Sequence, residues 1–189
     1  MNLLYEFLQK ITDIPEGSFL KLQKIAELKN VPANTLLINL GEVPSKYFFL
    51  QNGVIRSFYS SESGKTYNRR IYTSYTFAAP IIDFLKKEPS RLTFETLTES
   101  TLFETRFDSF FALCNEDKYI DKLYSKILEQ HIIKYEEHYR DIILLNATER
   151  YLKLRKQIPN IDQLIPQYQI ASYINVTPVQ LSRIRKSLR

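Results

Sequence analysis

The sequence has a single cysteine, Cys114, and only four glycines among its 189 residues. One cysteine cannot form an internal disulfide or a cysteine-rich metal site, and it suits a reducing compartment. So few glycines leave no glycine-rich loop to cradle phosphates. No apolar run approaches the ~20 residues of a membrane span, and the N-terminus lacks a signal-peptide pattern. These absences predict a cytoplasmic protein without membrane contact, without a bound metal and without a cofactor.

Patterns of catalytic residues are scarce as well. His131 and His138 are seven residues apart in a helical stretch, but no Ser–His or carboxylate–His–Cys pattern accompanies them. Packing or solvation explains this pair more simply than a metal site. Cys114 follows an aromatic cluster and is most simply a buried apolar residue, and Asp83 is expected in a charged loop. The sequence therefore predicts no enzymatic activity.

Positive charge is concentrated at the C-terminal end of the chain. Residues 147–189 contain eight basic and two acidic side chains, whereas the first 146 residues contain 18 basic and 19 acidic ones. Neutralisation of phosphates and release of their counterions favour a polyanionic partner for such a segment. A uniformly basic chain would be less informative about where that partner binds.

The last two dozen residues are predicted to form two short helices joined by a tight turn. Asn175 tolerates the left-handed backbone that ends the first helix, Thr177 caps the second, and Pro178 occupies its first position, where no N–H is needed. The second helix carries an apolar stripe formed by Leu181, Ile184 and Leu188, and its remaining surface is polar and basic. This pattern indicates a helix-turn-helix whose second helix enters the DNA major groove. A small helical hairpin with a basic end is the alternative.

The N-terminal part of the chain divides into a helical lead and a β-rich region. Residues 1 to about 30 show two apolar stripes at helical spacing. From Pro32 to about Phe107, short runs rich in threonine, aromatic and aliphatic residues alternate with turn signals, which predicts a β-roll or sandwich. The runs are Thr35–Leu40, Tyr47–Leu50, Val54–Ser60, Thr66–Thr73, Leu92–Leu97 and Leu102–Phe107.

A long helical segment follows over residues 116–145, which contain no glycine or proline. A helix of nearly thirty residues spans about 45 Å, more than a small β-roll can cover. We therefore expect part of its apolar stripe to meet a second copy as a coiled coil, with packing inside one subunit as the alternative. A further helix is predicted over Ala147–Gln157, with Leu152 and Leu154 facing inward. The stripe on the long helix comprises Ile120, Tyr124, Leu128, Ile132, Tyr135, Tyr139 and Ile142.

Together these parts resemble the Crp/Fnr superfamily of bacterial transcription regulators. The resemblance covers nearly the whole chain and rests on the strand–turn–strand QNGVIRSFYSSESGKTY, on the segment ATERYLKL with Thr148 and Arg150, and on the closing helix TPVQLSRIRKSL. It implies an α+β fold: a helical lead, an antiparallel β-roll like a cyclic-nucleotide-binding domain, a long dimerisation helix and an all-α helix-turn-helix domain. The corresponding domain boundaries are 1–115, 116–146 and 147–189. The implied partners are a second copy, double-stranded DNA and RNA polymerase.

The sequence departs from the family where cyclic-nucleotide-binding members hold their ligand. Their phosphate cassette has the pattern F-x-G-E-L…R-S-A, and the matching stretch here begins at Phe77. Ala79 replaces the glycine and Pro80 replaces the glutamate, while Tyr135 and its acidic neighbour replace a Thr-Ser pair that touches the purine. Because each charged hydrogen bond is worth roughly 1.5–3 kcal/mol, several kcal/mol of binding are lost. Cyclic AMP is therefore not expected as the effector.

Another small-molecule effector remains compatible with the sequence. Arg91 lies where the family's phosphate-binding arginine would be, and with Arg69 and Arg70 it could hold a different anion, although solvated surface arginines are the simpler interpretation. The iron–sulfur cluster of the oxygen-sensing branch is excluded because Cys114 has no cysteine partners. The residues expected around an effector are Phe77, Ala79, Pro80, Arg91 and Tyr135.

The recognition helix also departs from the family. Where relatives that read a guanine-containing half-site place Arg-Glu, this chain has Pro178 and Val179, which have no hydrogen-bonding side chains. Arg183 is expected to contact guanine O6 and N7, Gln180 an adenine, and Val179 a thymine methyl group.

Three further side chains, those of Gln167, Thr177 and Lys186, are expected to contact phosphates and so to position the helix. The sequence ends at Arg189, directly after this helix, so the β-wing of most relatives is expected to be missing. The leading hypothesis is a homodimeric, DNA-binding transcription regulator. The alternative is a ligand-binding sensor or protein-interaction module that has lost DNA binding.

Overall fold

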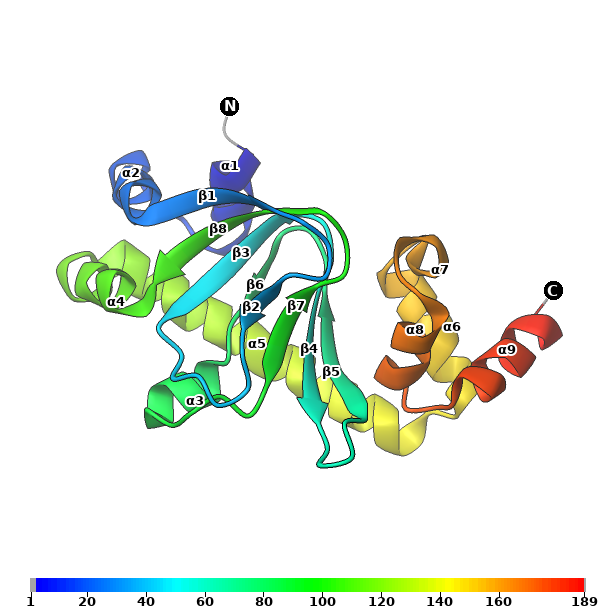
Figure 1. Ribbon diagram of the computed structural model, residues 1–189. Helices are drawn as coiled ribbons and strands as arrows, with labels where there is room; N and C mark the ends of the chain where they lie inside the picture. Colours follow the sequence, from blue (N-terminus) through cyan, green and yellow to red (C-terminus); the bar gives the residue numbers. More distant parts are fainter. Residues whose placement is uncertain (1–2, 189) are drawn as a thin grey trace.

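The computed structural model describes residues 3–188. Its strands are β1 (Ala26–Val31), β2 (Leu36–Ile38), β3 (Lys46–Asn52), β4 (Ile55–Ser60), β5 (Thr66–Tyr72), β6 (Thr76–Ala78), β7 (Thr93–Thr96) and β8 (Ser100–Arg106). Its helices are α1 (Leu3–Ile11), α2 (Glu16–Ile25), α3 (Ile81–Lys86), α4 (Phe107–Glu116), α5 (Lys118–Leu144), α6 (Ala147–Gln157), α7 (Ile161–Leu164), α8 (Gln167–Tyr173) and α9 (Pro178–Ser187). Figure 1 shows the strands gathered into one body, with α5 running along it to the C-terminal helices.

The strands form the predicted roll. Two four-stranded antiparallel sheets, ordered β1-β8-β3-β6 and β2-β7-β4-β5, face each other. Burial of aliphatic and aromatic side chains between them is the main stabilising contribution to this part of the molecule. The α+β fold expected from the sequence is therefore confirmed. The core between the sheets comprises Ile38, Phe48, Leu50, Ile55, Tyr72, Ala78, Leu92, Phe94 and Leu102.

The predicted strands all occur, but two further strands escaped prediction. Residues 26–30 were expected to be helical, and this is wrong: β1 pairs with β8 along its whole length, from Ala26 opposite Thr105 to Val31 opposite Ser100. The backbone groups at the edge of β8 are satisfied by this pairing, which outweighs a weak helical stripe. Strand β6 has three residues and is too short to show an alternating pattern.

The turn that precedes β4 requires its glycine. Gly53 has φ +105°, a conformation that side-chain-bearing residues rarely adopt. A Cβ atom there would lie 2.2 Å from Ser100 Oγ and 2.8 Å from the Glu99 carbonyl oxygen. The close approach of β8 therefore excludes any larger residue.

The long helix begins at a capped break after α4. Asp117 is the N-cap of α5, and its carboxylate accepts hydrogen bonds from the Tyr119 N–H at 3.1 Å, Ser18 Oγ at 2.9 Å and Lys21 Nζ at 2.8 Å. Burial raises the pKa of Asp117, but the bonds from Lys21 and Ser18 outweigh burial and hold the pKa below its usual value. These contacts fix α2 against the start of α5.

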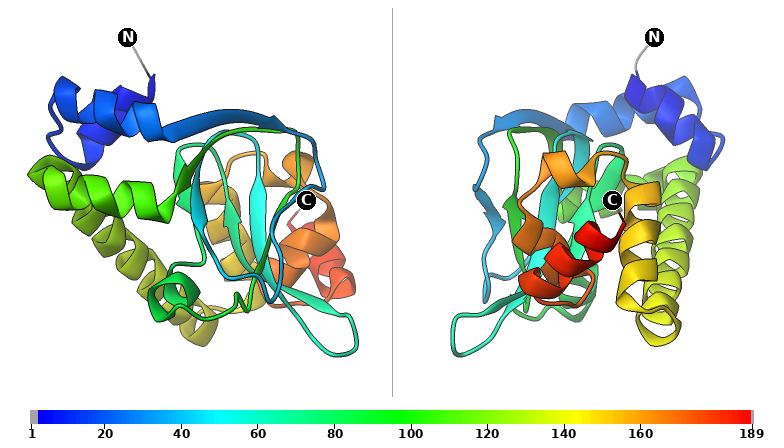
Figure 2. Two further views of the ribbon diagram at one scale, coloured as in Figure 1. Left: turned by 60° about the vertical axis from the view of Figure 1, so that its left-hand side comes forward. Right: turned by 90° about the vertical axis from the view of Figure 1, so that its right-hand side faces the viewer.

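The apolar stripe of α5 is covered along its first half and exposed along its second. Ile120 is fully buried against the rest of the chain, whereas Ile132 is 63% exposed and Tyr139 is 55% exposed. Figure 2 shows α5 crossing the roll and continuing to α6. One subunit therefore leaves a row of large apolar side chains in solvent. None of the helices within residues 3–188 is long and apolar enough to cross a membrane.

The C-terminal helices pack around an apolar cluster that also includes Val54 and Ile71 of the roll. Helix α6 begins with a capping box in which Asn146 and Glu149 exchange hydrogen bonds with each other's backbone N–H groups. Tyr151 and Leu154 are its buried residues, so the expectation that Leu152 faces inward is wrong: Leu152 is 44% exposed. Tyr151 takes the inward position because its ring is buried while its hydroxyl donates to Asp162 at 2.8 Å. The break between α5 and α6 lies at residues 145–146, directly before residue 147, where the sequence predicts the C-terminal domain to begin.

Candidate functional site

Helices α8 and α9 form the predicted helix-turn-helix. Asn175 has φ +58°, the left-handed conformation expected in the turn. Thr177 is the N-cap of α9, and its Oγ accepts from the Gln180 N–H at 3.2 Å. The Val176 N–H donates to the Ala171 carbonyl at 3.0 Å and closes the turn. The local signals in the sequence therefore gave the correct turn and cap.

Helix α9 has one buried face and one exposed face. Leu181 is buried in the apolar cluster, whereas Val179, two residues earlier and therefore on the opposite side of the helix, is 61% exposed. Arg183 and Lys186 are exposed on the same side as Val179, because residues three to four positions apart share a helix face. Leu188, predicted as part of the apolar stripe, is 41% exposed.

The basic side chains of α9 differ in what they contact. The Nε of Arg185 lies 3.6 Å from Oδ1 of Asp162, so this guanidinium faces its own domain. Within residues 3–188, no ion pair engages Arg183 or Lys186. The two cations on the exposed face are therefore free to meet an external anion.

Two of the predicted DNA-contacting side chains are engaged inside the domain. The amide oxygen of Gln180 accepts from the Thr177 N–H at 2.8 Å, so a two-bond contact with adenine requires Gln180 to leave the capping box. Gln167 lies in α8, and its amide nitrogen donates to the Asp162 carbonyl at 3.3 Å. Its Oε1 is buried with no hydrogen-bond partner among the residues described. The structure thus does not place Gln167 on the exposed face of α9.

A buried polar network, which the sequence analysis did not predict, joins the helix-turn-helix to the roll. Arg56 in β4 is 9% exposed, and its Nε donates to Glu95 at 2.7 Å. Its NH1 donates to Oε1 of Gln169 in α8 at 2.9 Å, and the side-chain amide of Asn68 donates to the same oxygen at 2.7 Å. The Asn68 N–H also donates to Ser172 Oγ at 2.9 Å. Arg56 and Asn68 lie more than 100 residues from their partners Gln169 and Ser172 in the chain, so no local pattern could reveal these contacts.

Apolar contacts reinforce this attachment. Val54 and Ile71 of the roll belong to the same buried cluster as Ile170 and Leu181 of the helix-turn-helix. Figures 1 and 2 show α8 against the roll and α9 at the outer side of the molecule. The roll therefore holds α8 and leaves the exposed face of α9 accessible.

The residues expected around an effector do not converge on one cavity. Ala79, Pro80 and Arg91 border a small cavity of about 30 Å³. Arg91 is not free there, because its Nε and NH2 lie 3.0 and 2.9 Å from Oδ1 of Asp83. Asp83 itself is buried and belongs to α3, so its expected place in a charged loop is wrong. Helix α3 directs the Asp83 carboxylate toward the guanidinium of Arg91, the group to which an external anion would have to bind.

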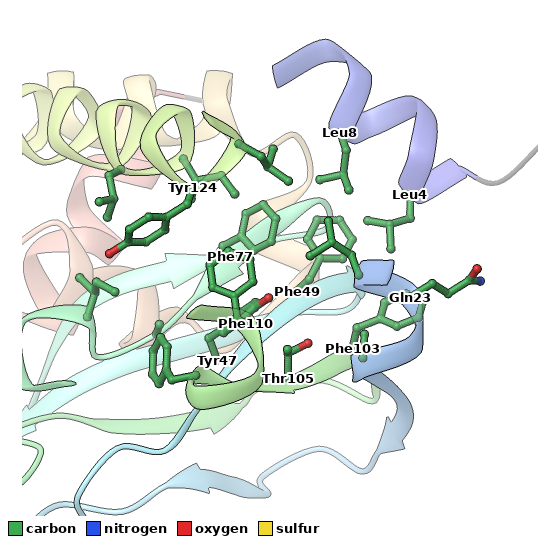
Figure 3. A pocket seen from close by; sticks show the side chains of 18 of the residues that line it. Leu4, Leu8, Gln23, Tyr47, Phe49, Phe77, Phe103, Thr105, Phe110 and Tyr124 are labelled. Atoms are coloured by element: carbon green, nitrogen blue, oxygen red, sulfur yellow. The ribbon is translucent and has the colours of Figure 1, made fainter. Parts of the chain in front are cut away.

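Phe77 and Tyr135 lie elsewhere. Phe77 lines an apolar cavity of about 100 Å³ between the β1-β8-β3-β6 sheet and the helices α1, α2, α4 and α5 (Figure 3). Its ring centroid is 5.0 Å from that of Phe49. Tyr135 borders a third cavity, between α5 and the C-terminal domain. The five candidates are thus distributed over three cavities, and Ala79 borders both the small cavity and the apolar one.

The titratable side chains singled out by the sequence do not form a catalytic or metal-binding group. Cys114 is half-buried, and burial, with a smaller contribution from Asp121, raises the pKa of its thiol to about 11. Such a thiol stays protonated and unreactive at neutral pH. Within residues 3–188, no three histidine, cysteine, aspartate or glutamate side chains gather where they could hold a metal ion.

The histidines are held neutral. Burial, followed by the neighbouring charges of Arg70, Arg69 and Lys134, lowers the pKa of His131 to about 4. Burial also lowers the pKa of His138, whose ring stacks on Tyr173 at 5.0 Å between centroids.

We expect a loss of stability on acidification that depends on His131. Because its folded pKa of about 4 lies below the unfolded value of about 6.5, the unfolded chain binds the extra proton between these pH values. His131 therefore does not lower the free energy of unfolding above pH 6.5, but it lowers this free energy by at most about 1.4 kcal/mol per pH unit as the pH falls toward 4. Urea denaturation of the protein and of His131→Gln between pH 7 and 4 measures the difference. Parallel curves for the two proteins would contradict the prediction.

Comparisons with known proteins agree with this architecture. Residues 28–117 match the family model of the cyclic nucleotide-binding domain. The regulator CLP of Xanthomonas campestris, described as responsive to c-di-GMP, is 13% identical, with 92% of this chain and 91% of that one covered and a TM-score of 0.71. FixK2 of Bradyrhizobium japonicum is 16% identical over 87% of this chain and 84% of that one, with a TM-score of 0.72.

A regulator from Eubacterium rectale that is assigned to the Crp/Fnr family has a TM-score of 0.69 at 9% identity, with 93% of this chain and 83% of that one covered. No curated protein matches the sequence significantly. Residues 28–117 are therefore similar to the cyclic nucleotide-binding domain family, and the chain as a whole has the fold of the Crp/Fnr regulators.

Proposed function

We propose that the protein is a homodimeric, DNA-binding transcription regulator of bacterial origin that acts in the cytoplasm and does not respond to cyclic AMP. The observation that carries the proposal is the exposed face of α9. Val179, Arg183 and Lys186 share that face, and the two cations have no ion pair within the described part of the chain. An apolar side chain flanked by free cations suits a major groove, where thymine methyl groups and guanine acceptors lie between phosphates.

The partition of charge in the C-terminal domain supports the same proposal. Arg185 and Arg155 both approach Asp162 and stabilise the domain itself. Arg183 and Lys186 do not stabilise the domain in this way, and an unpaired cation on the surface contributes little to the free energy of folding. Their placement is explained by a polyanionic partner.

Dimerisation is supported by the exposed half of the α5 stripe. Ile132, Tyr135 and Tyr139 of the predicted stripe lie on one side of the helix together with Ile143, which follows Ile142, the last residue of that stripe. Their exposed fractions range from 53% to 63%. A row of this kind matches the seam of a two-stranded coiled coil. A dimer would present two copies of α9, as required by operators with two half-sites.

Arg183 and Lys186 are expected to contribute differently to DNA binding. Arg183→Ala should lower the ratio of specific to random affinity about tenfold or more, since a two-bond guanine contact discriminates by about 1–3 kcal/mol. Lys186→Ala should weaken binding to all sequences alike and reduce the salt slope by about 1. Fluorescence anisotropy on duplexes selected from a random pool by the full chain, at several salt concentrations, measures both effects.

Arg106→Ala, an exposed arginine on the roll, serves as the matched control and should leave both quantities unchanged. Equal losses on specific and random DNA for both α9 variants would contradict the assigned roles. If the full chain bound no duplex at all, the proposal would fail in favour of a sensor or protein-interaction module.

The effector and the contact with RNA polymerase belong to the same proposal. The pairing of Arg91 with buried Asp83 supports the exclusion of cyclic AMP, because the guanidinium already has an anionic partner. A regulator of this kind acts on transcription through RNA polymerase, and a different small molecule would have to bind elsewhere in the sensor.

A further inference from the structure

A polar cavity of about 350 Å³ lies where the roll, α5 and the C-terminal domain meet. We call it the junction cavity. Its size falls within the range of sites for small-molecule ligands. One side of the cavity is formed by β5, the loop after it and the start of β6. The remaining walls come from α5, from the end of α6 with the residue after it, and from α8. The residues that matter for its chemistry are Arg69, Arg70, His131, Lys134, Tyr135 and His138.

The charges in this cavity are not balanced. Asp141 borders it, but both of its oxygens are engaged by Lys153 at 2.6 and 2.7 Å. Within residues 3–188, no ion pair engages Arg69, Arg70 or Lys134, and Glu137 is exposed at the rim. Three cations therefore border the cavity, and Glu137 is the one acidic side chain on its wall that has no ion pair within the described chain.

The cations act on one another across the cavity. The NH1 of Arg70 lies 3.3 Å from Nδ1 of His131. Desolvation, followed by the charge of Arg70, lowers the pKa of Lys134, and the same arginine lowers the pKa of both histidines. Groups that disfavour each other's charge in this way are stabilised by an anion placed among them.

We propose that the junction cavity binds a small anion of two or more negative charges, held by Arg70 and Lys134 with Arg69 at the rim. A guanidinium presents its donors as a fork that matches phosphate and carboxylate oxygens, and Lys134 adds a point charge from α5. The neutral imidazole of His131, beside Arg70, can donate one further hydrogen bond. The shared chemistry of the ligand is a cluster of phosphate or carboxylate oxygens.

The proposed anion-binding side chains differ from those of the family's phosphate cassette, although Tyr135, at the family's purine-touching position, also borders the junction cavity. Arg91 borders the small cavity beside α3 and is paired with Asp83. Arg69 borders both cavities, whereas Arg70 and Lys134 border the junction cavity alone among the cavities described here. Variants of Arg70 and Lys134 therefore separate the new site from the cassette.

The position of the cavity gives binding a structural consequence. Leu154, Gln157 and Tyr173 of the C-terminal domain form part of its wall, opposite β5 and α5. An anion bound by both Arg70 on the roll and Lys134 on α5 would hold these two elements together. It would thereby rigidify the surface of the roll against which α8 packs. The effect on DNA binding rests on the proposed function, but the binding of the anion does not.

Calorimetric titration of the full chain in the absence of DNA, with pyrophosphate and separately with citrate, tests the proposal. We expect saturable binding of at least one probe, and Arg70→Gln and Lys134→Gln should each weaken it about tenfold or more, the effect of losing one charged hydrogen bond. Tighter binding of pyrophosphate would identify a phosphorylated ligand, and tighter binding of citrate a polycarboxylate. Arg91→Gln, the matched control in the cassette, should bind as the unmodified protein does.

Lys134 is exposed on α5, so its variant should fold even if the Arg70 variant does not. A second readout is the His131 ring in NMR spectra, whose pKa of about 4 should rise when an anion offsets the arginine charges. Absence of saturable binding of both probes would overturn the proposal. A loss with Arg91→Gln, together with unchanged binding by the Lys134 variant, would overturn it too. Because no DNA is present, neither result bears on the regulator function itself.

Discussion

The double substitution Ile132→Glu and Ile143→Glu is expected to convert the protein into a monomer and to weaken operator binding by about a hundredfold or more. Both side chains lie on the exposed side of α5, where they are 63% and 60% exposed in the single subunit. Four like charges facing each other across a coiled-coil seam would oppose association. The fold of the subunit should survive, because neither side chain belongs to a buried cluster.

The reason for the large effect on DNA is geometric. Two recognition helices on one dimer bind two half-sites together, so the second contact is intramolecular and multiplies the affinity. A monomer keeps one weak contact. Sedimentation equilibrium should give about 22.4 kDa for the double variant and twice this mass for the unmodified protein. Anisotropy with a two-half-site duplex measures the loss of affinity.

Gln130→Glu supplies the control, because Gln130 is exposed on α5 but lies to one side of the seam. This variant should remain dimeric and keep its affinity. If the unmodified protein sedimented as a single 22.4 kDa chain, the dimer and the mode of DNA binding proposed above would both be refuted.

Gln169→Ala is expected to destabilise the protein by about 2–3 kcal/mol, with a Tm lower by roughly 5–10 °C. Its Oε1 accepts from Arg56 at 2.9 Å and from Asn68 at 2.7 Å, and all three side chains are buried. Removing the acceptor leaves a guanidinium N–H and an amide N–H without one of their partners, away from water. Such buried donors cost more than the average hydrogen bond contributes.

Urea denaturation followed by circular dichroism gives the free energy of unfolding, and Gln163→Ala is the matched control. Gln163 is an exposed glutamine in α7 of the same domain. Its variant should stay within about 0.5 kcal/mol of the unmodified protein. Similar losses for the two glutamine variants would show that the network at Arg56 contributes nothing beyond ordinary surface contacts.

Features set by neighbours along the chain could be predicted from the sequence. The turn at Asn175, the cap at Thr177 and the six strands between turn signals depend on local backbone preferences, which residue types reveal directly. The apolar period of residues 118–144 likewise predicted one long helix. Strand β1 was missed because its pairing with β8, not its own composition, decides its conformation.

What only the tertiary structure decided is which polar side chains remain free. In the sequence alone, Arg183 and Arg185 are indistinguishable basic residues of one helix. In the fold, Asp162 of α7 lies beside Arg185 and forms an ion pair with it, whereas Arg183 stays exposed. Asp83 reaches Arg91 in the same way, and Gln169 reaches Arg56 across 113 positions. Local preferences act over one or two turns of helix, whereas hydrogen bonds and burial depend on partners that chain folding brings together from any distance. The sequence by itself thus determined the order and type of the elements, and the fold decided where a ligand or a nucleic acid finds an unpaired charge.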